Sequence, residues 1–462
     1  MALNWKDLFK LFLIGPMVIG LFGCVSQTKT VSNPVASPPD FSAAGTQEVP
    51  ERWWTVFDNQ QLNQTVEKAL SSNFNLKSAW QRLKASQAIA DRQSAALLPS
   101  LEASARGETT ESQSNVEDDE SFELGLTAVY ELDLWGSIRS SAEAEEYRAR
   151  ASLADYQTAG LSLSAEIVRT WYQIAAAKNQ RSLVESQVKT NRQVLGLLKN
   201  RLGIGQVQGV DILRQERLLE STLQQKSIVE SRIQVLEHQL AVLLGESPQK
   251  DLSTSAEHLP DLPPLPETGL STELVRRRPD VRSAFNLLQA ADRDLASAIS
   301  NQYPRLTLTA SASSAAENAN NLFEDWALSF AGNLLAPIFY GGELSAEVDR
   351  TEAIKRQRLY EYGQAILTAF QEVEDALIRE EKQKESIESL QEQVSLSVQA
   401  YERLQNQYFN GTSNYLDVLT ALDEVQQLRR DLLTAQLTLI EYRVALYRAL
   451  AGSFKIEQES RE

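Results

Sequence analysis

The feature that most constrains this chain is an internal duplication, because one half of the sequence repeats the other at an offset of about 205 residues. The register continues almost without gaps over roughly 180 residues, apart from a one-residue slip. A period this long excludes a solenoid of short repeats and predicts a duplicated half-molecule. The aligned pairs include Pro99 and Pro304, Leu101 and Leu306, Trp135 and Tyr340, Gly205 and Gly411, and Asp211 and Asp417.

The duplication and local composition divide the chain into six segments. Between the copies, residues 260–266 contain several prolines and cannot form a continuous helix. The predicted segments are a signal peptide (1–23), a flexible tether (24–50), a first structural repeat (51–245), a Pro-rich linker (246–269), a second structural repeat (270–451) and a C-terminal tail (452–462).

The amino-terminal segment has the pattern of a targeting signal. Lys6 and Lys10 precede the apolar run 11–22, which is too short to span a bilayer as a mature helix. Cys24, the only cysteine, follows directly, and the segment resembles a bacterial lipoprotein signal. That resemblance implies cleavage before Cys24, lipidation of its sulfur and sorting to the outer membrane. The alternative is an ordinary signal peptide with an incidental cysteine.

Composition excludes several classes of function. A net charge of −17 argues against nucleic-acid binding, which needs a basic surface, and predicts that a narrow passage in this protein attracts cations. One cysteine excludes an intramolecular disulfide, and two histidines exclude a histidine-rich metal site. Neither a Walker motif nor a Rossmann fingerprint is present, so no cofactor is expected.

Each copy is predicted to begin with a helix that a proline ends. The helices are expected at residues 59–98 and 272–302, before Pro99 and Pro304. Two stretches of alternating apolar and polar residues follow in each copy, separated by polar loops at 107–120 and 311–325. The apolar positions are Leu101, Ala103 and Ala105, then Phe122, Leu124, Leu126, Ala128 and Tyr130 in copy one, and Leu306, Leu308 and Ala310, then Trp326, Leu328, Phe330, Gly332 and Leu334 in copy two.

This alternation is typical of transmembrane β-barrel strands, although a soluble hairpin shows the same pattern. No later segment has the pattern of a transmembrane helix, so a membrane crossing would have to use strands. Four strands cannot close a barrel, and open edges are not tolerated in hydrocarbon. Three chains would supply twelve strands.

Very long helices are predicted after the strands, from Gly136 to about Leu202 and from Gly341 to about Tyr408. Each would be roughly 100 Å long. Their apolar residues have heptad spacing, and return helices follow turns at 203–209 and 410–414, which predicts antiparallel coiled coils. The predicted fold is mainly α with a membrane β-barrel part, and each half-molecule combines strand hairpins with long antiparallel coiled-coil helices.

The order of these features resembles the TolC-type outer-membrane factors, in particular the lipid-anchored subgroup that serves RND multidrug pumps. The resemblance covers about residues 51–451. It implies a homotrimer in the outer membrane of a Gram-negative bacterium, contacting outer-membrane lipid, with a trimeric twelve-stranded β-barrel continued by a periplasmic α-barrel. It also implies a passive exit duct for small molecules, which an inner-membrane pump delivers through a periplasmic adaptor. An enzymatic activity is not expected.

The same resemblance assigns roles to particular residues. The turns that include Gly205, Gln206, Gly411 and Thr412 would contact the adaptor, although glycine also suits a helix end on its own. Ser413 and Thr420 occupy positions where some relatives have an arginine and an aspartate, so a salt-bridge latch through them is not expected. Further expected sites are a periplasmic gate formed by Asp211, Asp417 and Tyr408, and membrane-interface aromatics Trp135 and Tyr340, which could instead pack beneath the strands.

Two alternatives to small-molecule efflux remain open from the sequence. The first is a protein-secretion exit duct of type I with the same fold. The second is a lipid-anchored periplasmic coiled-coil scaffold or adaptor, which would have no membrane strands and no trimeric pore. The alternating stretches at 122–130 and 326–334 argue against the scaffold.

Overall fold

The structure is a computed structural model. It describes residue 35, residues 41–110, 119–249, 259–268 and 277–452, and residues 454 and 456. Cys24, the signal peptide and the first part of the predicted tether lie outside the described residues.

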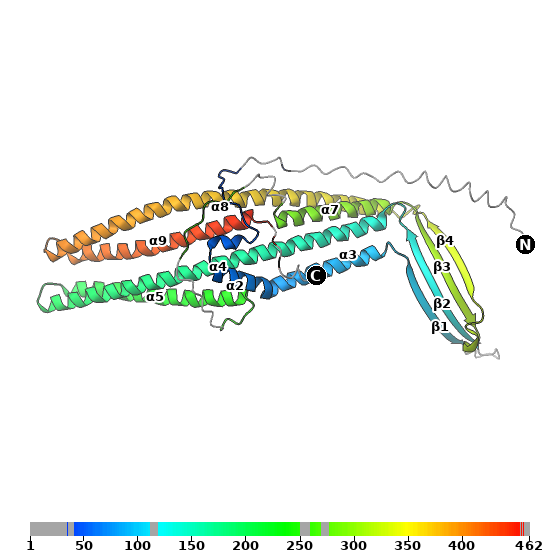
Figure 1. The fold of residues 1–462 in the computed structure, drawn as a ribbon, viewed down its shortest axis with the longest axis horizontal. Coiled ribbons are helices and arrows are strands. Elements are labelled where there is room, and N and C mark those ends of the chain that lie inside the picture. The colour runs from blue at the N-terminus through cyan, green and yellow to red at the C-terminus, as the bar shows by residue number, and fades with distance from the viewer. Residues whose placement is uncertain are drawn as a thin grey trace, which may run out of the picture. The chain divides into compact units, whose positions relative to one another are not determined.

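Both copies have the same order of elements, as the duplication predicts: helix, two strands, a long helix and a return helix (Figure 1). Along the described residues, no helix has both the length and the apolar character needed to cross a bilayer. The first copy contains η1 (Trp53–Phe57), α2 (Gln60–Ser72), α3 (Phe74–Ala95), β1 (Ser100–Thr110), β2 (Asp119–Leu132), α4 (Ser137–Gly203) and α5 (Gly209–Leu243). The second contains α7 (Pro279–Ser300), β3 (Arg305–Ala316), η2 (Ala319–Asn321), β4 (Ala327–Leu335), α8 (Glu343–Phe409) and α9 (Tyr415–Leu450).

The chain forms two compact units. The first includes Arg82–Leu153 and Ser283–Gly363 and contains the strands. The second includes Val35–Gln81, Ala154–Arg282 and Gln364–Glu462 and contains α5, α9 and the larger, carboxy-terminal parts of α4 and α8. Each unit therefore draws on both copies of the repeat.

In the first unit, the two strand hairpins join into one antiparallel sheet with the order β1-β2-β3-β4. Strands β2 and β3 pair across the duplication, and β1 and β4 are the edges. Because side chains alternate along each strand, the register places apolar residues on one face and polar residues on the other. The apolar face includes Leu101, Leu126, Tyr130, Leu308, Leu328 and Phe330, and the polar face includes Glu102, Arg106, Glu131, Thr307, Ser311 and Asn333.

The strands extend further than the sequence predicts. The expected loops began at Gly107 and Ser311, whereas β1 continues to Thr110 and β3 to Ala316, and β2 begins at Asp119. The added residues form regular backbone pairs, for example Ser311 with Thr127. Small and polar side chains interrupt the apolar pattern there, but the backbone hydrogen bonds do not depend on it.

The predicted helix 59–98 is two helices, so that prediction is wrong at Asn73. The backbone of Asn73 is extended (ψ 126°), and its side-chain oxygen accepts a hydrogen bond from the amide of Leu76 at 3.0 Å. Asn73 therefore ends α2 and caps the start of α3, as asparagine does at helix N-termini. In the second copy, α7 begins at Pro279, where proline suits a first helical position.

The duplication is visible in how each return helix ends. The Nδ2 of Asn73 donates to the carbonyl of Leu243 at 2.9 Å. In the second copy, Nη1 of Arg278 donates to the carbonyl of Ala449 at 3.3 Å. Both contacts satisfy a carbonyl in the last turn of a return helix, α5 or α9. Asn73 and Arg278, which match in the repeat, therefore both satisfy the end of a return helix, one with an amide group and the other with a guanidinium group.

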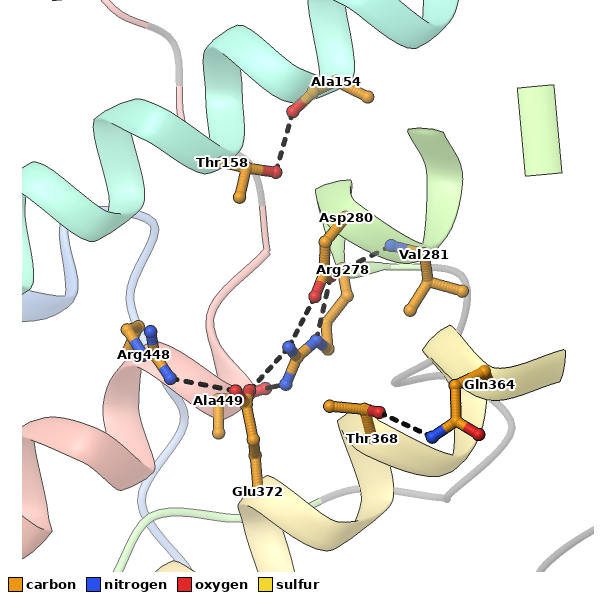
Figure 2. Close-up of polar contacts among 10 residues, drawn as sticks. All are labelled: Ala154, Thr158, Arg278, Asp280, Val281, Gln364, Thr368, Glu372, Arg448 and Ala449. Carbon is orange, nitrogen blue, oxygen red and sulfur yellow. Dashed lines mark hydrogen bonds and ion pairs between the residues drawn. The ribbon is translucent and has the colours of Figure 1, made fainter. Parts of the chain in front are cut away.

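Arg278 is also part of an ionic cluster in the second unit (Figure 2). Its Nη2 lies 2.6 Å from Asp280 Oδ2 and 2.7 Å from Glu372 Oε2, and Arg448 lies 3.0 Å from the other oxygen of Glu372. Burial alone would raise the pKa of Asp280, but the hydrogen bond and charge of Arg278 hold it below its ordinary value.

The last ten residues of the predicted tether are packed rather than free, so the tether is shorter than expected. The amide of Gly45 donates to the carbonyl of Pro266, and the amide of Glu267 donates to the carbonyl of Gln47. Phe41 also contacts Phe370 of α8. Residues 45–47 thus lie along the Pro-rich linker, which gives two irregular segments backbone partners.

Candidate functional site at the hairpin turns

The two hairpin turns have the same geometry, one in each copy. Gly205 and Gly411 have φ of +74° and +77°, a left-handed conformation that favours glycine. After α4, the amide of Gln206 donates to the carbonyl of Arg201; after α8, the amide of Thr412 donates to that of Gln407. This is the Schellman pattern of helix termination. Gly205, Gln206, Gly411 and Thr412, the predicted contact residues, are all exposed.

Alanine at Gly205 or Gly411 is expected to destabilise its turn by about 1–2 kcal/mol, because an L side chain resists the left-handed backbone. Gly209 is a matched control, since it begins α5, has an ordinary φ and has open space around its Cα. Hydrogen exchange of the last-turn amides of α4 and α8 measures the effect. Faster exchange in G205A or G411A but not in G209A is the expected result, and equal exchange in all three would contradict it.

Asp211 and Asp417 lie in the first turns of the return helices, where negative charge is favoured. Asp211 is mostly buried and lies 3.4 Å from Nη1 of Arg214 in its own helix. Asp417 is exposed, and its Oδ2 accepts a hydrogen bond from Oγ of Ser413 at 3.0 Å. Within one chain, each carboxylate therefore bonds inside its own hairpin.

Tyr408 joins the two hairpins through ring contacts. Its ring centroid lies 5.7 Å from that of Tyr415 and 5.5 Å from the guanidinium carbon of Arg201 on α4. Its hydroxyl is buried and has no hydrogen-bond partner in the part of the chain that the structure describes. Tyr408 packs against an apolar cluster that joins the two hairpins. Its members are Leu198, Ile212, Leu218, Tyr415, Val418, Leu419 and Leu422.

Exposed apolar side chains surround these turns, a feature that the sequence patterns did not single out. Ile204 is 70% exposed and Leu213 66% exposed on the first hairpin, and Phe409 is exposed on the second. Large apolar side chains gathered on a surface often mark a contact site. A search for apolar residues outside the heptad positions could have found Ile204 and Leu213.

Trp135 and Tyr340 follow the strands but differ in their surroundings. The Nε1 of Trp135 donates to the carbonyl of Pro304 at 2.8 Å, and its ring stacks on Tyr303 at 4.9 Å. Tyr340 is about half exposed and follows Ile338 and Phe339 in the chain, which are almost fully exposed. Trp135 therefore also packs at the strand base, and the membrane-interface role of both residues stays a prediction.

Among the described residues, no group of three or more His, Cys, Asp and Glu side chains is arranged to hold a metal ion. The turns instead present backbone, carboxylates and apolar side chains at the end of two packed hairpins. Such an arrangement can contact a partner or restrict a passage.

Comparisons with known proteins agree with this architecture. The family model described as "Outer membrane efflux protein" matches twice, at residues 65–246 and 270–452. The chain is 30% identical to the pyoverdine export outer membrane protein OpmQ of Pseudomonas aeruginosa, over 95% of this chain and 96% of that protein. It is 28% identical to the solvent efflux pump outer membrane protein SrpC of Pseudomonas putida, over 87% of each.

A solved structure is similar over nearly the same length. The open state of the MtrE outer membrane channel of Neisseria gonorrhoeae matches with a TM-score of 0.81 and 27% identity, covering 93% of this chain and 98% of that one. The prediction of a TolC-type fold is therefore confirmed. The chain belongs to the outer membrane efflux protein family and is the outer-membrane component of an efflux system.

Proposed function

We propose that three copies of this chain form one closed tunnel, lipid-anchored in the outer membrane through Cys24, that conducts small molecules passively. The observation that carries the proposal is the four-stranded sheet, which has one apolar and one polar face and whose edges, β1 and β4, have no strand partner among the described residues. Backbone groups at such edges need partners in hydrocarbon, and the β4 edge of one copy with the β1 edge of the next supplies them.

The sheet faces fit the wall of such a barrel. Phe330 and Leu328 on β4 are 83% and 73% exposed on the apolar face, and Leu101 on β1 is also exposed there, as suits contact with lipid. Glu131 and Thr307 pair on the other face, which would line an aqueous lumen. Strand number also fits, because twelve strands close a barrel and four do not.

The hairpin turns are proposed as the periplasmic end, where an adaptor and an inner-membrane pump would dock. The exposed Gly205, Gln206, Gly411 and Thr412, together with Ile204 and Leu213, would form the contact surface. Relatives named for pyoverdine export and solvent efflux support small organic molecules as the substrate class. No side chain needs to react with the substrate, because the duct only conducts.

Single-channel conductance of the purified protein in a planar bilayer tests this proposal, with its mass in detergent measured alongside. A trimer that inserts and passes ions is the expected result. A monomer or dimer that never inserts would overturn the tunnel and favour a periplasmic scaffold.

Replacing both Asp211 and Asp417 with asparagine is expected to reduce cation selectivity and to change conductance. Three copies would bring six carboxylates to the narrow end, where crowded negative charge attracts cations. The measurement is the reversal potential under a salt gradient across the bilayer. As a control, Glu352 near the start of α8 can be changed to glutamine, which removes a carboxylate that is not part of the turns. Unchanged selectivity in the double variant would rule out the gate.

A further inference from the structure

A cavity of about 240 Å³ lies between three helices of the second unit, α4, α5 and α9. An apolar protein cavity of about 150 Å³ is already large enough to hold one benzene molecule. Ile228 in the lining is 51% exposed, and Arg232 and Thr434 are exposed as well, so the cavity opens to solvent. One molecule of the size of a substituted benzene therefore fits and can enter.

The inner wall of the cavity is apolar and consists of small side chains of α4. Ala176 and Ala177 are only 7% and 5% exposed, and Val229 on α5 and Leu437 on α9 are buried beside the cavity. Alanine side chains end at Cβ, so they leave a hollow between α5 and α9 that larger side chains would fill. This wall favours the apolar body of a ligand, as in most small-molecule sites.

Polar side chains from all three helices surround this wall. The charged ones are Arg232 on α5 and Arg430 and Asp431 on α9. Two guanidinium groups and one carboxylate give the lining a formal charge of +1, in a chain whose net charge is −17. The cavity therefore favours an anion, unlike the chain as a whole. The amide side chains of the lining are Gln173, Gln180, Gln225 and Gln427.

The guanidinium group of Arg430 is held in place by neighbouring amides. Its Nη1 donates to Oε1 of Gln187 at 2.7 Å, and its Nη2 donates to Oε1 of Gln427 at 2.6 Å. Nε2 of Gln427 donates in turn to Oδ1 of Asp431 at 2.8 Å, so this carboxylate already has a partner. Burial lowers the pKa of Arg430, which means that an anion placed beside it would stabilise its charged form.

Arg232 has its hydrogen-bond donors free. It is exposed and forms no ion pair with any residue that the structure describes, whereas Arg214 on the same helix pairs with Asp211. A guanidinium group binds a carboxylate through two parallel N–H···O bonds and also stacks on aromatic rings. Arg232 can therefore supply the donors for a ligand carboxylate, and Arg430 adds a fixed positive charge.

We infer that this cavity binds one small aromatic carboxylate per chain, with the carboxylate against Arg232 and Arg430 and the ring on the alanine wall of α4. Apolar wall, size and charge each match one part of such a molecule. None of the lining residues belongs to the hairpin turns. A passive duct needs no binding site, so the cavity adds a function to conduction.

Isothermal titration calorimetry with benzoate, on the purified full-length protein in detergent, tests this site. Saturable binding of one benzoate per chain is the expected result, and R232Q should weaken it at least ten-fold. R217Q is the matched control, because Arg217 is exposed on the same helix and does not line the cavity. It should bind benzoate like the wild type. Equal weakening in both variants would show unspecific attraction between charges and would overturn the site.

Toluene tests the need for the carboxylate, because it keeps the ring and is neutral. It should bind at least ten-fold more weakly than benzoate. Hydrogen exchange of α9 amides 427–437 gives a second readout, with slower exchange expected when benzoate is added to the wild type but not to R232Q. Absence of saturable benzoate binding to the folded wild type, or equal affinity for toluene, would overturn the assignment. Both measurements are made without conduction, so failure of the tunnel and failure of the site are distinguishable.

Discussion

Replacing Glu380 with alanine is expected to lower the free energy of unfolding by about 3–5 kcal/mol. The side chains of Glu380 on α8 and Arg443 on α9 are only 2% and 1% exposed, and Nη2 and Nε of Arg443 donate to the carboxylate at 2.6 and 2.7 Å. Arg443 also donates to the carbonyls of Pro263 and Pro264 in the linker. Without the carboxylate, a guanidinium remains buried with no compensating charge.

Thermal unfolding in detergent, followed by circular dichroism, measures this loss. The control is E352A, because Glu352 pairs with Arg356 on the exposed side of α8 and should contribute less than about 1 kcal/mol. The double variant E380L/R443M removes both charges and should regain most of the lost stability. Equal unfolding temperatures for E380A and E352A would show that the buried pair does not stabilise the hairpin.

The buried pair of Glu380 and Arg443 is also expected to make the free energy of unfolding depend on pH. Burial alone would raise the pKa of Glu380, but hydrogen bonds from Arg443 and Lys384 hold it below its ordinary value. The unfolded chain therefore takes up a proton at higher pH than the folded chain does. This stabilisation is complete above the ordinary glutamate pKa, about 4.3, and is lost as the pH falls through the lower folded value. The E380L/R443M variant has no carboxylate at this position, so it should lack that part of the stability loss at acidic pH.

The sequence predicted the elements that depend on long patterns. The offset that relates Gly205 to Gly411 and Asp211 to Asp417 placed both hairpin turns, and the heptad residues placed the long helices within a few residues. Prolines 99 and 304 correctly separated helix from strand. These features repeat over many residues, so a local exception does not hide them.

Features that depend on a single contact were missed. Asn73 breaks the first helix because its side chain caps Leu76 and bonds to Leu243, which is distant in sequence. Residues 41–50 have a tether-like composition, yet backbone pairing fixes them to the linker. Asn191 is a fully buried polar residue within the apolar heptad series of α4, so an apolar pattern does not reveal it. A polar residue inside an otherwise regular heptad series is the signal that points to such a position.

Trp53→Ala is expected to destabilise the second unit by about 3–5 kcal/mol. Trp53 has no solvent exposure, although it lies in the short 3-10 helix η1 rather than in a long helix. Its ring stacks on Tyr447 of α9 at 5.9 Å, and its Nε1 donates to Oγ of Ser164 on α4 at 3.0 Å. One aromatic side chain thus connects the long helix of the first copy to the return helix of the second.

Three variants separate the roles of the ring and of the hydrogen bond. W53F keeps most of the stacking and should cost clearly less than W53A, whereas S164A leaves the buried Nε1 unpaired and should cost about 1–3 kcal/mol. F74A is the control, since Phe74 is 69% exposed in the same unit and should change stability by about 0.5 kcal/mol or less. Denaturant unfolding ranks the four variants by their loss in free energy of unfolding. If W53A unfolded like F74A, η1 would be a passive surface segment, and the two copies would be held together by their long helices alone.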